Sequence, residues 1–331
     1  MPSTLLRSEV SVVGSDAVGR RRHTRGRKRA LRAARNLVLA RLIGAVGSLL
    51  GTLPLCAAVH VGGALGAGAY RLLGRDRRRA LEHLAMAFPE LGAGTRARLA
   101  RETFRNAGRS FAELAQWPHV QRRLREFVTI EGIDHLERGL AVGRGVIAVT
   151  GHTGNWELLA ATVAQLGYTL NVVARRVNED RFDRLISAFR IRAGVRTVRR
   201  GEASALRDIV RGLRAGGILA LLIDQDTRGP GVFVPFFGRP ARTSPGAATV
   251  ALRTGAPVLA TFIERRPPGH HICFQPLYGF GSEDSRRPTV EELTARFTAA
   301  IEAQIRHRPS EWVWWHRRWR HQPPAETVVE R

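Results

Sequence analysis

"GVIAVTGHTGNWELLA" (Gly145 to Ala160) joins a short apolar run to a pattern typical of a helix. The run is Val146–Thr150, and the helical pattern extends from Trp156 to Leu166, where a glycine follows. A short apolar run next to glycine is typical of a strand buried on both faces. The stretch therefore predicts a strand, a loop that contains His152, and a helix.

The same alternation continues along the chain from about Phe127. Further strands are predicted at 169–174, 195–198, 218–223, 257–264 and 271–277, and further helices at 181–192, 203–214, 247–254 and 289–306. Alternating strands and helices favour parallel β-α-β units. We predict an α/β fold with a mostly parallel central sheet flanked by helices, preceded by an N-terminal membrane-associated helical segment.

The chain divides into five regions by composition and periodicity. We predict a basic tail at 1–36 that is disordered, a membrane-associated hydrophobic segment at 37–70, a helical segment at 71–126, the α/β domain at 127–323 and a short tail at 324–331. Apolar residues make up 44% of the 331 residues, which is enough for a sizeable core.

The charge balance is strongly basic. The chain has 53 Lys and Arg against 28 Asp and Glu, a formal charge of +25, and nearly all of the cations are arginines. Such a surplus implies an anionic partner, which is nucleic acid, an anionic membrane surface or a phosphorylated substrate.

The segment from Leu42 to Tyr70 contains no Asp, Glu, Lys or Arg. It is long enough to cross a bilayer, which takes about 20 residues. It is also rich in glycine and contains Pro54, so a tilted span, a re-entrant hairpin and a membrane-embedded helix pair all fit. Arginines flank both ends, which slightly favours placing both flanks in the cytoplasm.

The two cysteines, Cys56 and Cys273, lie far apart and fit neither a disulfide framework nor a metal site. "HHIC" (His270 to Cys273) is interpreted as part of a strand. No Walker A pattern and no G-x-S-x-G pattern occurs, which argues against an α/β-hydrolase. We expect no metal and no cofactor.

His152 lies just beyond the carboxyl end of a predicted strand, where open α/β sheets bind ligands. Glu157 follows five residues later, and the two side chains would be ~140° apart in a continuous helix. A loop at Thr153–Gly154, with Thr153 or Asn155 as the helix cap, lets Glu157 accept a hydrogen bond from the imidazole. The pair would then form a general base. Alternatively, Glu157 is only a helix-start acid favoured by the helix dipole.

Two other residues follow predicted strands, Arg175 and Asp224. Asp224 is suited to orient an arginine, to contact a substrate or simply to cap its loop. "VFVPFFG" (Val232 to Gly238) is unusually apolar for a loop, and it fits an acyl groove, a lipid contact or a buried loop. "WVWWHRRW" (Trp312 to Trp319) interleaves tryptophan and arginine, which suits a membrane interface or single-stranded nucleic acid.

"HTGNWE" (His152 to Glu157) resembles the H-x4-D/E motif of the glycerolipid acyltransferase superfamily. The chain from about Tyr70 to Pro323 is similar to the late lipid A biosynthesis acyltransferases of Gram-negative inner membranes. Four further stretches support the resemblance: "RRRALEHLAMAFPEL", "RIRAGVRTVRRGEA", "IDQDTRGPGVFVPFFGRPARTSPG" and "EWVWWHRRWRHQP". The phosphatidylinositol mannoside acyltransferases share the motif, so they remain an alternative.

The resemblance implies a membrane-bound enzyme that transfers an acyl chain from acyl carrier protein or coenzyme A to a glycolipid hydroxyl. It implies His152 as general base, Glu157 as its partner and an active site on the cytoplasmic face of the inner membrane. It also implies that phosphates are bound by arginines of the second stretch, with Arg190 or Arg192 as the functional one and Arg199 and Arg200 nearby. Membrane lipids are expected partners. A basic nucleic-acid-binding protein is the non-enzymatic alternative, which the uncharged Leu42 to Tyr70 segment disfavours.

Overall fold

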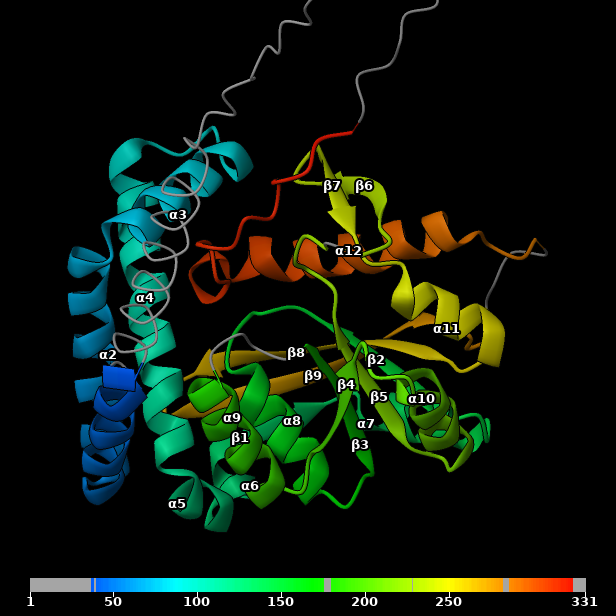
Figure 1. Cartoon of the computed structure of the whole chain (residues 1–331), viewed down its shortest axis with the longest axis horizontal. Coiled ribbons are helices and arrows are strands. Elements are labelled where there is room, and N and C mark those ends of the chain that lie inside the picture. The colour runs from blue at the N-terminus through cyan, green and yellow to red at the C-terminus, as the bar shows by residue number, and fades with distance from the viewer. Residues whose placement is uncertain (1–36, 39, 176–179, 228, 282–285, 324–331) are drawn as a thin grey trace, which may run out of the picture.

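The computed structural model describes residues 37–323 apart from 39, 176–179, 228 and 282–285. The two predicted tails therefore lie outside the described residues. Within them, a central sheet lies between two layers of helices, and the N-terminal helices stand against one end of this domain (Figure 1).

The central sheet has seven strands in the order β1-β9-β8-β2-β5-β3-β4. Their bounds are β1 Val128–Glu131, β2 Val146–Thr150, β3 Leu170–Arg175, β4 Arg196–Arg200, β5 Ile218–Leu222, β8 Val258–Arg266 and β9 Gly269–Tyr278. All neighbouring strands pair in parallel except β8 and β9. The predicted mostly parallel sheet is confirmed, and the short β8–β9 connection makes the one antiparallel pair.

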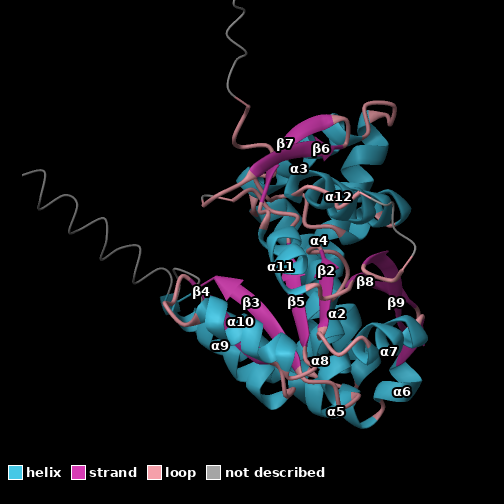
Figure 2. Cartoon of the chain, turned by 90° about the vertical axis from the view of Figure 1, so that its right-hand side faces the viewer, coloured by secondary structure: helices cyan, strands magenta, loops and turns pink. Residues whose placement is uncertain are grey.

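The strand residues alternate between two hydrophobic cores because successive side chains point to opposite faces of a sheet. Ile147 and Val149 of β2 pack in one core with α11 (Gly246–Thr254), α12 (Val290–His307) and the C-terminal tryptophans. Val146 and Ala148 pack in the other core with α7 (Ile133–Ala141) and α8 (Trp156–Gln165). Helices α9 (Asp180–Arg192) and α10 (Ala205–Arg214) complete the crossovers on these two faces (Figure 2).

Residues 232–243 form a small hairpin, not a loop. Strands β6 (Val232–Phe236) and β7 (Arg239–Thr243) pair antiparallel as a separate two-stranded sheet. Phe236 and Phe237 are buried in the core shared with α12, and Phe236 contacts Trp312 and Trp319. The predicted acyl groove or lipid contact at "VFVPFFG" is therefore wrong for these two rings, because they pack inside the protein.

The N-terminal region is a stack of helices. Residues 40–52 are helical, the chain breaks at Pro54, and α2 (Leu55–Leu72), α3 (Gly74–Ala87), α4 (Ala93–Ala115), α5 (Trp117–Arg122) and α6 (Leu124–Phe127) follow. Helix α2 lies tightly against α4, since a Cβ added to Gly66 would lie 2.2 Å from the carbonyl oxygen of Phe104. The uncharged segment thus forms two helices joined at a proline. Among the described residues, no helix has both the length and the apolar character that crossing a bilayer requires.

Candidate active site

The loop after β2 is held in place from several sides. Gly154 has φ +61°, and a Cβ there would lie 2.1 Å from the carbonyl oxygen of Ile263, so only glycine fits. The Gly154 N–H donates to the carbonyl of Glu311 at 3.0 Å. Asn155 caps α8 by accepting from the Leu158 N–H at 3.2 Å, as the sequence predicted.

A buried carboxylate lies beneath this loop. The side-chain amide of Asn155 donates to Glu113 of α4 at 2.9 Å. Glu113 also pairs with Arg265 and with His270 of β9. Burial alone would raise the pKa of Glu113, but His270 and Arg265 lower it to about 2. The carboxylate therefore stays ionised and ties α4, β8 and β9 to the start of α8.

His152 is oriented by Asp224, the residue two positions beyond β5. The His152 backbone N–H donates to Asp224 Oδ2 at 2.7 Å, and Nδ1 of the ring lies 2.8 Å from Oδ1. The register explains the contact: Thr150 of β2 is directly paired with Leu222 of β5, and His152 and Asp224 each follow two residues later. Neighbouring parallel strands thus deliver both groups to one edge of the sheet.

The carboxylate of Asp224 is completely buried and accepts a third hydrogen bond, from Trp312 Nε1 at 2.7 Å. Burial alone would raise its pKa, but the charge and hydrogen bonds of His152 hold it well below the usual range. An ionised Asp224 accepts a hydrogen bond from Nδ1–H of His152, which leaves the Nε2 lone pair free to act as a base.

Glu157 does not contact His152, which corrects the predicted pairing. Its two carboxylate oxygens accept hydrogen bonds from Arg190 of α9, at 2.8 Å from Nε and 2.6 Å from Nη2. This fork-to-carboxylate pair is largely buried, with 13% of the Arg190 side chain and 8% of the Glu157 side chain exposed. The prediction failed because spacing along the chain does not reveal that β5 puts a nearer carboxylate beside the imidazole.

The other predicted arginines do not gather at His152. Arg199 donates to Asp183 at 3.1 Å, and Arg200 donates to Thr227 at 3.4 Å. Arg192 is exposed at the end of α9. Arg175 ends β3, and its side chain lies outside what the structure describes. Among the arginines of the stretch from Arg190 to Ala203, only Arg190 contacts a residue of the loop and helix that follow His152, namely Glu157.

Two further residues at the site were not predicted, Gln225 and His316. The Gln225 amide nitrogen lies 3.0 Å from Nε2 of His152 and 2.6 Å from Nε2 of His316. The rings of His152 and His316 are 5.2 Å apart. Burial, with a smaller effect of the nearby His152, lowers the pKa of His316 to about 3, so this imidazole is neutral. The sequence did carry a signal, since both residues lie in stretches that resemble the family.

Most of the tryptophan and arginine segment lies inside the protein, which corrects both surface interpretations for the buried residues, whereas Trp315 is half-buried and Arg317 is exposed. Trp312 and Trp314 have no exposed surface, and Arg318 is equally buried. Arg318 donates to the carbonyl of Arg242 at 2.9 Å and to Thr243 at 2.6 Å. Buried rings offer no stacking platform for bases and no contact with lipid. The segment instead closes the site by supplying Trp312 and His316.

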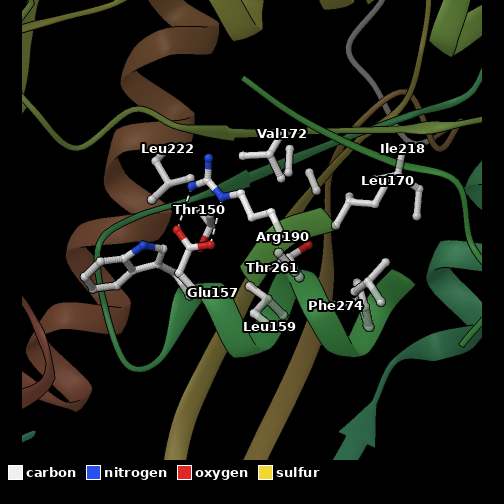
Figure 3. Close-up of a pocket in the computed structure, with 15 residues that line it drawn as sticks. Thr150, Glu157, Leu159, Leu170, Val172, Arg190, Ile218, Leu222, Thr261 and Phe274 are labelled. Atoms are coloured by element: carbon white, nitrogen blue, oxygen red, sulfur yellow. Dashed lines mark hydrogen bonds and ion pairs between the residues drawn. The ribbon is translucent and has the colours of Figure 1, made fainter. Parts of the chain in front are cut away.

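An apolar cavity lies beside the histidine, between α8 and the sheet (Figure 3). The mouth, defined as the end of the cavity nearest His152, is lined by Trp156 and the Glu157–Arg190 pair, and the ring of Trp156 is 5.0 Å from that of His152. Its walls come from α8, β2, β3, β5, β8 and β9: Ala148, Leu159, Ala160, Val163, Leu170, Val172, Ile218, Ala220, Thr261 and Phe274. The site therefore combines a base at the surface edge with a narrow apolar interior.

Comparison with known proteins gives a match to one family model over most of the chain. The family model described as bacterial lipid A biosynthesis acyltransferase matches residues 24–321. The chain is 28% identical over 283 residues to the lipid A biosynthesis palmitoleoyltransferase of Escherichia coli K12, covering 84% of this chain and 89% of that protein.

Two other relatives have different acceptors or acyl chains in their names. The lipid A biosynthesis lauroyltransferase of Escherichia coli K12 is 26% identical over 82% of this chain and 88% of its own length. The phosphatidylinositol mannoside acyltransferase of Mycobacterium tuberculosis H37Rv is 29% identical over 62% of this chain and 65% of its own length.

Proposed function

The chain belongs to the bacterial lipid A biosynthesis acyltransferase family, and we propose that it transfers a fatty acyl chain from a thioester to a glycolipid hydroxyl with His152 as general base. The observation that carries the proposal is the pairing of His152 with the buried Asp224 at the mouth of an apolar cavity. A base for the hydroxyl and a channel for the acyl chain then meet at one point.

The proposed reaction is direct. Nε2 of His152 takes the proton of the acceptor hydroxyl as its oxygen attacks the thioester carbon. The C–O bond forms, the C–S bond breaks, and the same proton passes to the departing sulfur. Asp224 stabilises the imidazolium that forms in between, and it holds the ring so that Nε2 faces the acceptor. No acyl-enzyme is required.

We assign Glu157 and Arg190 to positioning. Their buried pair joins the first turn of α8 to α9 at the mouth of the cavity, beside Trp156. Removing either partner would leave an uncompensated buried charge, which is strongly destabilising in proteins. Loss of Glu157 should therefore damage activity through the shape of the mouth and not through the basicity of His152.

We propose that the apolar cavity receives the acyl chain. Its lining runs from Trp156 at the mouth to Val163, Leu170 and Ile218 below, and its walls are almost wholly apolar. Apolar walls with a polar group only at the entrance are typical of pockets for apolar ligands. The cavity is narrow as it stands, so a chain that enters would spread the side chains of α8 away from the sheet.

The proposed acceptor is a lipid A precursor, and the donor is acyl carrier protein or coenzyme A. The names of the Escherichia coli relatives support that acceptor. A phosphatidylinositol mannoside or another glycolipid is the second candidate, favoured by the mycobacterial relative. Arg175 and Arg200 end β3 and β4 at the carboxyl edge, Arg199 precedes Arg200, and Arg192 ends α9. We propose these four arginines as contacts for phosphates of donor or acceptor.

We propose that the protein docks on the cytoplasmic face of the inner membrane through the helices at 40–52 and α2. Seven of the twelve exposed large apolar side chains in the described chain lie in these helices or directly next to them: Val38, Leu42, Leu49, Val61, Leu65, Leu72 and Leu73. Val61, Leu65 and Leu72 fall on one side of α2, away from the face that packs on α4. Exposed Arg71, Arg75 and Arg78 lie beside Leu72 and suit anionic headgroups.

The function is tested with purified protein, a lipid A precursor, a phosphatidylinositol mannoside and both thioester donors, followed by mass spectrometry of the lipids. We expect acylation of one acceptor, and a loss of ~10²–10⁴ in rate for His152→Ala. His119→Ala is the control. It removes an exposed histidine of α5, outside the proposed site, and should leave the rate unchanged. An active His152→Ala enzyme would contradict the assignment of the base.

The acyl cavity is tested by filling it. Ala160→Leu adds bulk halfway along the cavity, so it should lower kcat/KM for a sixteen-carbon donor at least ~10-fold more than for an eight-carbon donor. Ala164→Leu makes the same change one turn later on α8, where the side chain does not line the cavity. Equal losses for both chain lengths in Ala160→Leu would place the acyl chain elsewhere.

Membrane docking is tested by flotation with vesicles of mixed neutral and anionic lipid. Leu49→Ser, Leu65→Ser and Leu72→Ser together should lower the vesicle partition coefficient more than ~10-fold, because burying a leucine contributes ~1.5–3 kcal/mol. The control carries Val142→Ser, Leu166→Ser and Leu206→Ser, which are also exposed apolar residues but lie on other elements. Complete release of the wild-type protein by high salt would contradict apolar docking.

A further inference from the structure

We propose that the side-chain amide of Gln225 stabilises the oxyanion that forms on the thioester carbonyl, and that His316 holds this amide in place. The inference rests on the proposed acyl transfer and adds to it the group that receives the developing charge. His152 and Asp224 supply the base, but neither is a donor for a carbonyl oxygen while His152 takes up the proton.

The position of Gln225 suits this task. Its Nε2 lies 3.0 Å from Nε2 of His152 and 3.2 Å from Nδ1 of the same ring. Nearly equal distances to both ring nitrogens place the amide over the face of the imidazole and off the in-plane lone pair of Nε2. The lone pair stays open for the acceptor hydroxyl, while a donor stands directly beside it.

The chemistry of the neighbours decides which end of the amide faces the site. Because Asp224 accepts a hydrogen bond from Nδ1–H of His152, Nε2 of that ring carries a lone pair and is an acceptor. Over the ring face, the carbonyl oxygen of Gln225 would set its lone pairs against the π electrons of the imidazole, whereas an N–H group is attracted to them. The amide nitrogen is therefore the group that faces His152 and His316, and it has two N–H donors to offer.

His316 takes one of those donors. Its Nε2 is 2.6 Å from the amide nitrogen, and burial keeps the ring neutral, so Nε2 accepts when the ring proton sits on Nδ1. The backbone N–H of His316 is itself bound to the carbonyl of Val313 at 3.1 Å, and the adjacent Trp314 carbonyl lies 2.8 Å from Nδ1 of His83. The amide is thus anchored to a buried segment, and its second N–H points into the site.

In the reaction the acceptor oxygen bonds to the carbonyl carbon, and the carbonyl electrons move onto its oxygen. That oxyanion and the attacking oxygen are two bonds apart on one tetrahedral carbon. With the attacking oxygen on Nε2 of His152, the oxyanion comes within reach of a donor standing beside the ring. When the C–S bond breaks, the electrons return to the carbonyl, and the proton held by His152 passes to sulfur. Gln225 gives up no proton at any step.

Gln225→Met keeps the length of the side chain and removes both N–H groups. Loss of a single oxyanion donor typically costs ~10²–10³ in kcat. We therefore expect kcat to fall by ~10²–10³, with KM for donor and acceptor within about threefold of the wild type. Gln225→Glu, which puts carboxylate oxygens in place of the donor, should be at least as slow. Gln165→Ala, an exposed glutamine on the far end of α8, serves as the control and should behave as the wild type.

His316 is tested as a positioning residue by a double-mutant cycle. His316→Phe keeps the ring and removes the acceptor, so it should also lower kcat at unchanged KM. The double variant Gln225→Met with His316→Phe should be no slower than Gln225→Met alone, because both act through one hydrogen bond. A purely structural role for His316 would make the two losses multiply.

Two results would overturn the proposal: kcat of Gln225→Met within about threefold of the wild type, or a rise in acceptor KM with kcat intact, which would make Gln225 a binding contact. Each variant is checked for its melting temperature beside the wild type. If the wild type and Gln165→Ala transfer no acyl chain from any donor, the proposed function itself fails. If they are active and Gln225→Met is too, only the oxyanion assignment fails.

Discussion

The buried carboxylate of Asp224 is the constraint on which the site depends. A carboxylate without exposed surface is tolerated only where donors surround it. Here the donors are the backbone and ring of His152 and the indole of Trp312. These come from the loop after β2 and from the C-terminal segment, so one side chain joins three parts of the chain. Any change that leaves Asp224 without its donors would expose the core to an uncompensated charge.

The supports of the loop follow from the same geometry. Gly154 passes over β8 at a distance that no side chain allows, and Glu113 holds Asn155 from α4. Through Glu113 the loop that carries His152 is attached to the helix against which α2 packs. If α2 docks on lipid as proposed, the membrane-facing helices and the base are parts of one rigid connection. A glycolipid acceptor would then meet the base without leaving the surface of the bilayer.

The sequence predicted the elements well and their partners less well. Periodicity located β2, α8, β5 and α12 to within a residue or two, and the rule about carboxyl ends placed both His152 and Asp224 at the functional edge. It did not show that β2 and β5 are neighbours in the sheet, so the sequence favours the nearer acid along the chain, Glu157, as the partner of His152. Strand order is a property of the whole fold, and one sequence does not encode it in any local pattern.

The amino-acid composition of the C-terminal segment gave a wrong prediction of where its side chains lie. Tryptophan and arginine together suggested a surface, yet Trp312, Trp314 and Arg318 lie inside because the β6–β7 hairpin and α12 cover them. Gln225 and His316 show the same limit: no motif singled them out, and only the fold shows that they lie against the imidazole of His152. The proposed roles of these two residues rest on the distances between the Gln225 amide nitrogen and the two imidazole rings, and residue types alone do not give those distances.

Nitrogen NMR of the protein with ¹⁵N-labelled histidine tests whether Asp224 sets the protonation pattern of His152. The His152 signals are assigned by their loss in His152→Ala, which requires no enzymatic assay. We expect neutral His152 to carry its proton on Nδ1 in the wild type. In Asp224→Asn we expect the proton to move to Nε2, because the amide nitrogen of the new side chain would then face Nδ1. A wild-type His152 protonated on Nε2, or an unchanged pattern in Asp224→Asn, would contradict the account.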